Sequence, residues 1–508
     1  MLKKHLLSLC TGFLLIFSFP PFSLYPLAWI AFLPLFEAIE ELSPIYAFRM
    51  GFFSGCVFFL GILYWIVYAM VCYGGVSLPL SLVALFLLVL YLALYFALFC
   101  YFIKVFSIAF SPILIASLWV SLEYIRAHFL TGFPWELLGD SQYNWLSFIQ
   151  VADIGGVYLL SFLVMWGNAS FFQCLKKRNR QSYFGLFILV VCLGTTLFYG
   201  QNRLSFWKKQ CLISPKKINI GIIQGNINQN QKWKPTFQAS TVKIYEHLSK
   251  QAVKNHPELL IWPETALPFY FQEISPLRKQ ILTLVKEIKT SILLGSPAYE
   301  TGAEGIKYFN RAYLINEQGK IVGYYDKAHL VPFGEYIPCR KWLPFLSAIA
   351  PSVGDFSSGK EIQPLFLNGR YSFGVLICFE SIFPALSRKV VQRQALFLVN
   401  ITNDAWFGRT SAPYQHLAML VLRAVENRRG IARAANTGFS AFIEPTGSII
   451  MQTKLFERSY LTAKLPLIEN KTFYTKHGDI LVFLNFCVIF ILIVKTIRRG
   501  GWKRLKKV

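Results

Sequence analysis

Three side chains able to perform acyl chemistry, a cysteine, a carboxylate and an ammonium, each follow a separate apolar run of the sequence. They are Cys378 after the run 373–377, Glu264 after 259–262, and Lys327 after 321–325. Cysteine chemistry needs a base that removes the thiol proton and donors that stabilise the oxyanion formed by attack. The three residue types therefore supply a nucleophile, a base and a cation within one part of the chain.

The runs before these residues have the length and composition of buried β-strands. The ends of such strands are where α/β sheets place their sites. We expect the turn after Cys378 to expose the sulfur and to aim the next backbone N–H at the same point. Glu264 is then a general base in a partly apolar pocket, and Lys327 balances its charge and stabilises the oxyanion. A lone cysteine is more often a core residue, but three strands that each deliver one reactive group favour a site.

The segment from about residue 217 to 467 has the pattern of one α/β domain. Short β-rich runs alternate there with helix-like stretches such as 241–254 and 416–427. The predicted strands are 218–223, 259–262, 292–295, 312–315, 321–325, 373–377, 396–400 and 441–443. A domain of about 250 residues can bury a large core.

The rest of the chain is apolar enough for a membrane. The protein is 55% hydrophobic and 15% charged, whereas soluble proteins carry about 25% charged residues. Between residues 50 and 103 there is no Asp, Glu, Lys, Arg or His, which leaves room for two spans of roughly 20 residues. In all, the sequence predicts eight spans, at about 6–20, 24–38, 51–71, 78–103, 108–125, 148–172, 183–200 and 480–495.

The basic residues beside these spans predict the orientation. With eight spans, the clusters near both termini and between spans six and seven fall on one side, which the positive-inside rule makes cytoplasmic. We therefore expect a membrane domain with seven spans at 1–203, an extracytoplasmic catalytic domain at 217–467, and an eighth span with a basic cytoplasmic tail at 478–508. The net charge of +25 fits such loops and anionic lipid. Nucleic-acid binding is excluded, because the basic residues follow the span ends and form no aromatic-interleaved patch.

One stretch of the α/β domain, 340–360, breaks its pattern. Apolar side chains gather there next to a Gly/Ser-rich loop, namely those of Trp342, Leu343, Phe345 and Leu346. Exposed apolar residues on a loop suggest a flap that faces the membrane, and the alternative is an ordinary packed insertion.

Other polar residues carry weaker signals. His329 and His416 have no evident partner and are predicted to be structural, and the ten cysteines show no metal-ligand spacing. Glu123 and Asp153 lie in or beside predicted spans, where packing or loop contacts are favoured over a functional role. A group of arginines is predicted to form a solvated or ion-paired helix face, with lipid phosphate as the alternative partner: Arg423, Arg428, Arg429 and Arg433.

Longer motifs surround the three reactive residues. They are Gln224-Gly225-Asn226-Ile227 with Lys232-Trp233, Trp262-Pro263-Glu264-Thr265-Ala266, Tyr325-Asp326-Lys327, Leu330-Val331-Pro332-Phe333-Gly334-Glu335-Tyr336-Ile337-Pro338, Cys378-Phe379-Glu380 and Asn403-Asp404-Ala405-Trp406-Phe407-Gly408. In these motifs the chain resembles the nitrilase superfamily, and most closely its membrane branch, the apolipoprotein N-acyltransferases. The resemblance covers nearly the whole chain, including the eight predicted spans.

The resemblance implies a multi-span helical membrane domain joined to an αββα sandwich, and it implies roles for individual residues. In that family pattern Glu264 is the base, Lys327 the oxyanion stabiliser and Cys378 the nucleophile. Further residues resemble those that shape the pocket: Trp233, Glu335, Phe379 and Glu380. Phe379 stands where the family often has tyrosine, so a role that needs a hydroxyl does not carry over to this chain.

The resemblance also implies the substrates. A phospholipid acylates the cysteine, and the acyl chain then passes to the α-amino group of a lipoprotein's N-terminal diacylglyceryl-cysteine in a ping-pong sequence. We expect a monomer in the bacterial inner membrane, with no cofactor and no metal. Two rival functions stay open: a membrane-tethered amidase or nitrilase with a small soluble substrate, and a transporter. The transporter is disfavoured, because the spans lack paired charges and interrupted helices.

Overall fold

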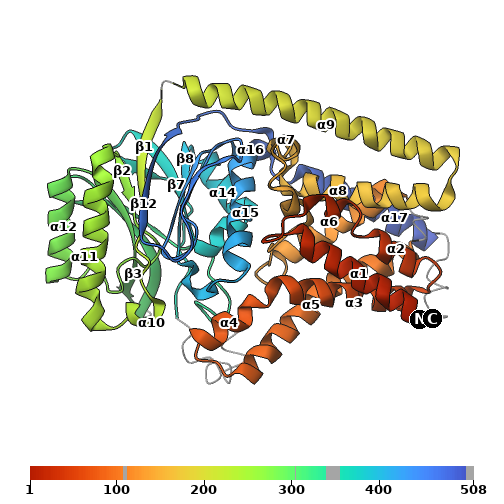
Figure 1. The fold of residues 1–508 in the computed structure, drawn as a ribbon, viewed down its shortest axis with the longest axis horizontal. Helices are drawn as coiled ribbons and strands as arrows, with labels where there is room; N and C mark the ends of the chain where they lie inside the picture. Colours follow the sequence, from red (N-terminus) through yellow and green to blue (C-terminus); the bar gives the residue numbers. More distant parts are fainter. Residues whose placement is uncertain (107–110, 215, 304, 339–354, 499–508) are drawn as a thin grey trace. The chain divides into compact units, whose positions relative to one another are not determined.

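The structure is a computed structural model that describes residues 1–106, 111–214, 216–303, 305–338 and 355–498 (Figure 1). The chain divides into two compact units. The first comprises Met1–Val67, Pro79–Ser205 and His477–Val508, and the second comprises Tyr68–Leu78 and Phe206–Lys476.

The first unit is helical. Among the described residues, five helices are long and apolar enough to cross a membrane: α3 (Pro44–Leu63), α5 (Leu78–Val105), α8 (Ala152–Lys177), α9 (Arg180–Ile213) and α17 (Ile480–Arg498). They overlap the predicted spans 51–71, 78–103, 148–172, 183–200 and 480–495. Two helices of 17 residues each, α1 (Leu2–Ser18) and α6 (Pro112–His128), overlap the predicted spans 6–20 and 108–125. Shorter helices are α2 (Leu33–Ile39) and α7 (Leu146–Ile149), while α4 (Trp65–Cys72) begins in this unit and continues into the second.

The predicted second span, 24–38, is broken into two short helical pieces. A 3₁₀ helix, η1 (Tyr25–Trp29), precedes α2, and each piece has a proline in its first two positions, Pro26 and Pro34. Proline lacks an N–H and is tolerated at the start of a helix, where that donor would have no partner, but it interrupts a helix interior. The two prolines therefore begin helices here and prevent one continuous span.

The second unit is a sandwich of two six-stranded sheets. Their strand orders are β12-β1-β2-β3-β4-β5 and β11-β10-β9-β8-β7-β6. In the first sheet the strands are β1 (Lys217–Gln224), β2 (Leu259–Ile261), β3 (Ser291–Gly302), β4 (Gly305–Ile315), β5 (Ile321–Asp326) and β12 (Ser459–Pro466). In the second they are β6 (Leu365–Leu367), β7 (Tyr371–Ile377), β8 (Phe397–Thr402), β9 (Ile431–Ala435), β10 (Ala441–Ile443) and β11 (Ile449–Gln452).

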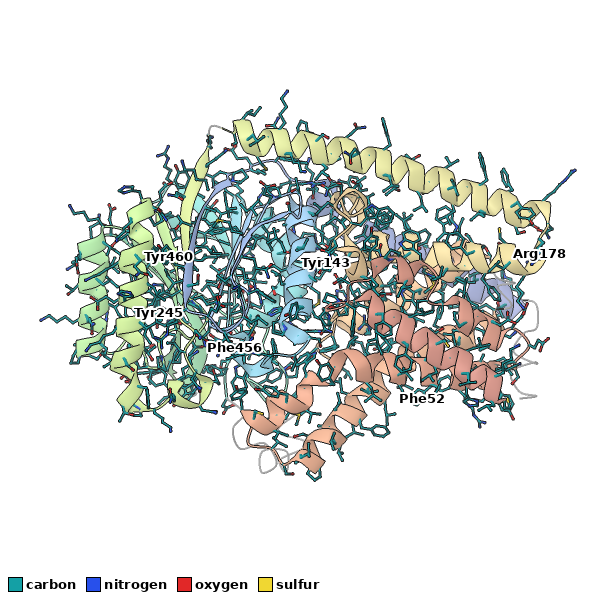
Figure 2. The ribbon with its side chains drawn as sticks, viewed as in Figure 1. Phe52, Tyr143, Arg178, Tyr245, Phe456 and Tyr460 are labelled. Carbon is teal, nitrogen blue, oxygen red and sulfur yellow. The ribbon has the colours of Figure 1, made fainter. Side chains whose placement is uncertain are left out.

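Alternation of side chains along the strands explains the layers. In β2, Leu259 and Ile261 join the core between the sheets, whereas Leu260 joins a second core under α11 (Pro235–Ala252) and α12 (Pro276–Ile288). This is the two-residue period of a strand that is buried on both faces. Tyr245 of α11 stacks on Trp262, and Tyr460 of β12 borders the same layer (Figure 2).

Helices also cover the second sheet. α14 (Pro384–Gln392) packs on β7 and on α15 (Ala412–Asn427), while α16 (Phe473–His477) ends the unit. The layers are thus helix, sheet, sheet and helix, and the predicted αββα sandwich is confirmed. The predicted flap residues Trp342, Leu343, Phe345 and Leu346 lie outside the described residues.

Candidate active site

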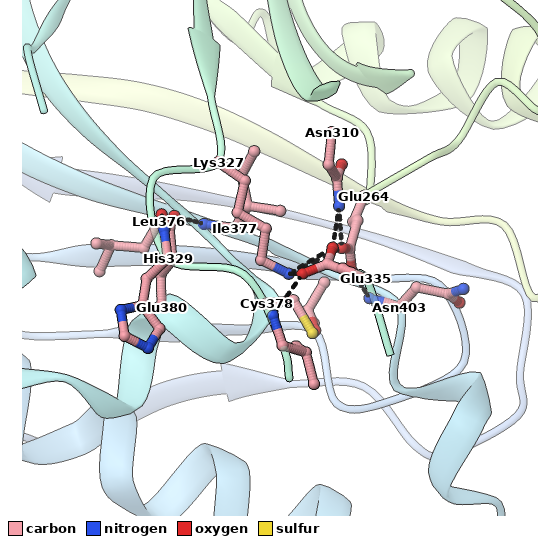
Figure 3. A network of polar contacts seen from close by, with 12 residues as sticks. Glu264, Asn310, Lys327, His329, Glu335, Leu376, Ile377, Cys378, Glu380 and Asn403 are labelled. Carbon is pink, nitrogen blue, oxygen red and sulfur yellow. Dashed lines mark hydrogen bonds and ion pairs between the residues drawn. The ribbon is translucent and has the colours of Figure 1, made fainter. Parts of the chain in front are cut away.

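The three reactive side chains come together at one end of the sandwich (Figure 3). Glu264 lies shortly after β2, Lys327 directly after β5, and Cys378 directly after β7. In the first sheet, β2 is parallel to β3, β3 is antiparallel to β4, and β4 is antiparallel to β5. Strands β2 and β5 therefore run in the same direction, and their C-terminal ends lie at the same edge of the sheet. The structure therefore assembles the three residues that the sequence analysis selected.

Lys327 sits between two carboxylates. Its Nζ lies 3.7 Å from Oε1 of Glu264 and 2.8 Å from Oε2 of Glu335. The lysine side chain is only 1% exposed, so no water competes for its charge. Burial alone lowers the pKa of Lys327, but Glu335 and Glu264 outweigh it and hold that pKa above its ordinary value. The ammonium is consequently a permanent cation at the site.

Glu264 is held by two neutral donors as well as by the lysine. Asn310 Nδ2 donates to its Oε1 at 2.7 Å, and the backbone N–H of Asn403 donates to its Oε2 at 2.8 Å. Gly295 makes room for the turn that carries it, because a Cβ there would stand 2.8 Å from the Glu264 Cα. Both carboxylate oxygens are therefore fixed in direction, as positioned proton acceptors must be.

Cys378 occupies a strained position at a strand-to-helix turn. Its φ is +51°, in the left-handed region that non-glycine residues seldom adopt. It is the first residue of the 3₁₀ helix η4 (Cys378–Ile382). The residue is half-buried, whereas Glu264 and Lys327 are buried. Cys378 is thus the most exposed of the three residues.

The thiol of Cys378 is protonated in the resting site. Burial raises its pKa, the negative charge of Glu264 raises it further, and Lys327 lowers it only in part. A preformed thiolate is therefore disfavoured, and a base must remove the proton as the sulfur attacks.

Glu380 ties the two loops of the site together. Its Oε1 accepts hydrogen bonds from Tyr325 Oη at 2.8 Å and from the backbone N–H groups of Ala328 and His329 at 2.7 and 3.0 Å. Its Oε2 accepts one from Ile377 N at 2.7 Å. One buried carboxylate thus joins the loop that carries the lysine to the turn that carries the cysteine.

The other predicted supporting residues fall into three situations. Glu335 is in the network, where it also accepts from Asn310 Nδ2 and from Val331 N. Phe379 is buried with its ring centroid 5.1 Å from that of Phe383. Trp233 is half exposed at the end of the short helix α10 (Gln229–Lys232).

Sequence reasoning missed several polar residues of the site. Asn310 belongs to none of the motifs, and Asn403 was noted only as the first residue of one, although its backbone N–H binds Glu264. Lys232 was noted only as part of a motif, yet it is 1% exposed, and its Nζ lies 3.5 Å from the carbonyl oxygen of Glu264. Burial lowers the pKa of Lys232 to about 8, against the opposing effect of Glu264. The signal for Lys232 in the sequence was its place beside Trp233 in one of the motifs.

Glu380→Gln should slow acylation of Cys378 by about tenfold or more. Three donors would keep an acceptor oxygen, but the new amide NH₂ would face the Ile377 N–H, and two facing donors destabilise a buried turn. Burial raises the pKa of Glu380 to about 7, against the hydrogen bonds that it accepts. The parent carboxylate is therefore ionised above pH 7 and neutral, like the amide, below it.

The measurement is the acylation rate of the parent divided by that of the variant, taken between pH 5.5 and pH 8.5. This ratio should be largest above pH 7 and should fall toward one below it. Glu457→Gln, at an exposed side chain that is paired with Lys454, is the matched control and should give a ratio near one. A ratio for Glu380→Gln that stays near one across the range would refute the positioning role.

A cysteine, a glutamate and a lysine at strand ends of an αββα sandwich define a protein of the nitrilase type. In agreement, the family model described as carbon-nitrogen hydrolase matches residues 219–470. A second model, described as the apolipoprotein N-acyltransferase N-terminal domain, matches residues 11–170.

Curated relatives agree over nearly the full length. The chain is 44% identical over 503 residues to the apolipoprotein N-acyltransferase of Geobacter metallireducens, covering 97% of this chain and 95% of that protein. It is 32% identical to that of Haemophilus influenzae, covering 96% and 94%. An amidase structure from Nesterenkonia sp. aligns with 53% of this chain and 96% of its own at 19% identity and a TM-score of 0.38. The chain belongs to the apolipoprotein N-acyltransferase family.

Proposed function

We propose that Cys378 takes an acyl chain from a phospholipid as a thioester and passes it to the α-amino group of a lipoprotein's N-terminal diacylglyceryl-cysteine. Membership of the family makes the chain an N-acyltransferase of lipoproteins and a bacterial multi-pass membrane protein. The observation that carries the proposal is the half-buried Cys378, at a strained turn, beside the buried pair Glu264 and Lys327.

In the first half-reaction, Glu264 accepts the thiol proton while the sulfur attacks the ester carbonyl. Lys327 stabilises the oxyanion of the tetrahedral intermediate. When the intermediate collapses, the ester C–O bond breaks, the protonated Glu264 returns its proton to the leaving alkoxide, and lysophospholipid departs. Cys378 is left as a thioester and Glu264 as a carboxylate, ready for the second substrate.

In the second half-reaction, the α-amine of the acceptor attacks the thioester carbonyl. Glu264 accepts a proton from the attacking nitrogen, and Lys327 again stabilises the oxyanion. The C–S bond then breaks, the proton held by Glu264 returns to the sulfur, and the amide product leaves. One base serves both halves because it ends each of them in its starting protonation state.

The charges of the site suit this sequence. Before attack, the two carboxylates of Glu264 and Glu335 flank the single ammonium of Lys327. During attack, Glu264 becomes neutral and the negative charge appears on the oxyanion, beside the same ammonium. The net charge does not change while its position does, so the buried site need not take up or release an ion.

A membrane location follows from the substrates. The donor and the acceptor are both anchored by acyl chains, and extraction of a chain into water costs about 0.8 kcal/mol per CH₂. We place the catalytic domain, 217–467, on the extracytoplasmic side. Support comes from the sequence, in which the eight predicted spans would place these basic residues on one side: Lys3, Lys4, Lys176, Lys177, Arg178, Arg180, Lys495 and Arg498. Protease added to spheroplasts should then cut within 217–467 and spare the basic tail.

All of the catalytic residues come from one chain, which supports a monomer.

The principal rival is a membrane-tethered amidase with a small soluble substrate, which would need the same three residues but not the apolar helices.

Purified enzyme given phospholipid without acceptor should release about one lysophospholipid per enzyme and then stop. The same enzyme given primary amides should release no ammonia above the background of a Cys378→Ala sample. Sustained ammonia release with no lysophospholipid burst would favour the amidase.

A further inference from the structure

A second polar cluster lies directly behind the nucleophile, and the mechanism above leaves it without a task. His416 of α15 is 1% exposed. Its Nε2 lies 3.2 Å from the carbonyl oxygen of Cys378 and 2.8 Å from Ser381 Oγ. Its Nδ1 lies 3.0 Å from Oδ1 of Asp404. The sequence analysis had treated this histidine as structural.

Buried polar partners of Asp404 anchor the cluster. Asp404 is fully buried, and its Oδ2 accepts from Arg433 Nη2 at 2.6 Å. Its Oδ1 accepts from Thr402 Oγ1 at 2.8 Å. Gly438 lets the carboxylate sit close to the backbone, since a Cβ there would overlap it. Arg433 Nη2 also lies 3.1 Å from His416 Nδ1 and can donate to it. The position of His416 is therefore set by the ion pair of Asp404 and Arg433 and not by packing alone.

The serine hydroxyl determines which ring nitrogen carries a proton. Ser381 Oγ donates its single hydrogen to the Cys378 carbonyl at 2.9 Å. The same oxygen can then only accept from His416, so Nε2 must be a donor. The single Nε2–H is shared between Ser381 Oγ at 2.8 Å and the Cys378 carbonyl at 3.2 Å. The hydroxyl and, through the shared hydrogen, the imidazole thus hold this carbonyl on one side.

An aspartate, a histidine and a serine in this order also match the arrangement of a hydrolytic triad. Ser381 is fully buried, however, and its hydroxyl is directed at a main-chain carbonyl. No substrate carbonyl can reach it, so the cluster does not form a second nucleophile.

The carbonyl that the cluster holds belongs to the peptide group between Cys378 and Phe379. In a trans peptide the C=O and the N–H point in opposite directions. Fixing the carbonyl toward α15 therefore fixes the Phe379 N–H toward the opposite side of the turn. Hydrogen bonds to a carbonyl also polarise the N–H of the same peptide, which makes it a stronger donor.

We propose that His416 is a positioning residue for acyl transfer, which with Ser381 holds the Cys378 carbonyl so that the Phe379 N–H joins Lys327 in binding the oxyanion. The inference rests on the proposed role of Cys378. It assigns the charged pair of Asp404 and Arg433 the task of keeping the imidazole in place. The nucleophile's strained φ of +51° is held by the same contacts.

The test separates a step that forms an oxyanion from one that does not. Thioester formation from phospholipid passes through a tetrahedral oxyanion, whereas alkylation of the same sulfur by iodoacetamide displaces iodide and forms none. In His416→Leu, thioester formation should fall by about 10–100-fold, somewhat less than the 10²–10³-fold seen when an oxyanion donor is removed outright. Alkylation should stay within about twofold of the parent.

His416→Gln keeps an N–H donor and should recover part of the lost acylation. Ser381→Ala is the smaller companion change, and it should lower acylation without lowering alkylation even if His416→Leu does not fold. Leu420→Ala, at a buried apolar position on the same helix, controls for loss of packing and should leave the ratio of the two rates unchanged.

Three results would overturn the inference: parental acylation in His416→Leu, equal falls in both rates as for a packing defect, or a His416→Gln variant no better than His416→Leu. These differ from failure of the proposed function, in which the parent enzyme itself would form no thioester at Cys378.

Discussion

Cys378→Ala should lose acyl transfer by about 10⁴-fold or more, the scale on which removal of a covalent nucleophile acts. The side chain is small and half-buried, so the folded protein should keep its yield and thermal midpoint. The measurement is transfer of a labelled acyl chain from phospholipid to a diacylglyceryl lipopeptide. The loss is expected because methyl cannot form the thioester on which both half-reactions depend.

Cys211→Ala is the matched control, since Cys211 is buried in the same unit of the chain but far along the sequence from the catalytic turn. It should transfer at the parental rate. Near-normal transfer by Cys378→Ala would remove the nucleophile from the account. Cys378→Ser should also be inactive, because a serine hydroxyl holds its proton much more strongly than a thiol does.

Glu264→Gln should form no detectable thioester, because an amide cannot accept the thiol proton. The same change should make the sulfur easier to ionise. The charge of Glu264 raises the pKa of Cys378, so the neutral glutamine should lower it, and the pH profile of iodoacetamide alkylation should move to lower pH. Acylation and alkylation therefore change in opposite directions, which simple misfolding would not produce.

Glu258→Gln provides a control at a carboxylate whose contact is with the backbone N–H of Asn219, away from the reactive groups. Neither its acylation rate nor its alkylation profile should change. An accumulated thioester formed at the parental rate in Glu264→Gln would exclude this glutamate as the base.

Sequence patterns located the strands that carry the site but not all of the sheet around them. The predicted runs 218–223, 321–325 and 373–377 agree with β1, β5 and β7, because each is a compact apolar stretch with clear breakers. Four strands were not predicted: β6, β9, β11 and β12. β9 reads Ile-Ala-Arg-Ala-Ala, and alanine has a weak strand preference. β12 pairs with β1 across more than two hundred residues, a partnership that no local pattern encodes.

The residues of the site also fall into those that local sequence predicts and those that it does not. Cys378, Glu264 and Lys327 were predicted because each follows an apolar run, so their positions depend on local sequence. The importance of Asn310 and His416 depends on contacts between distant segments, since the first binds Glu264 and the second binds Cys378. The pocket role of Trp233, taken from a motif, stays a prediction for a side chain that the structure leaves half exposed.

The central claim is a covalent acyl-enzyme at Cys378, and the intact mass of the purified protein tests it most directly. After incubation with phospholipid and no acceptor, the mass should rise by one long-chain acyl group. Hydroxylamine should remove the group, and Cys378→Ala should not acquire it. A diacylglyceryl lipopeptide added next should discharge the adduct at the rate at which N-acylated product appears. Product formation at full rate with no adduct on the enzyme, or an adduct of a few carbons only, would contradict the account.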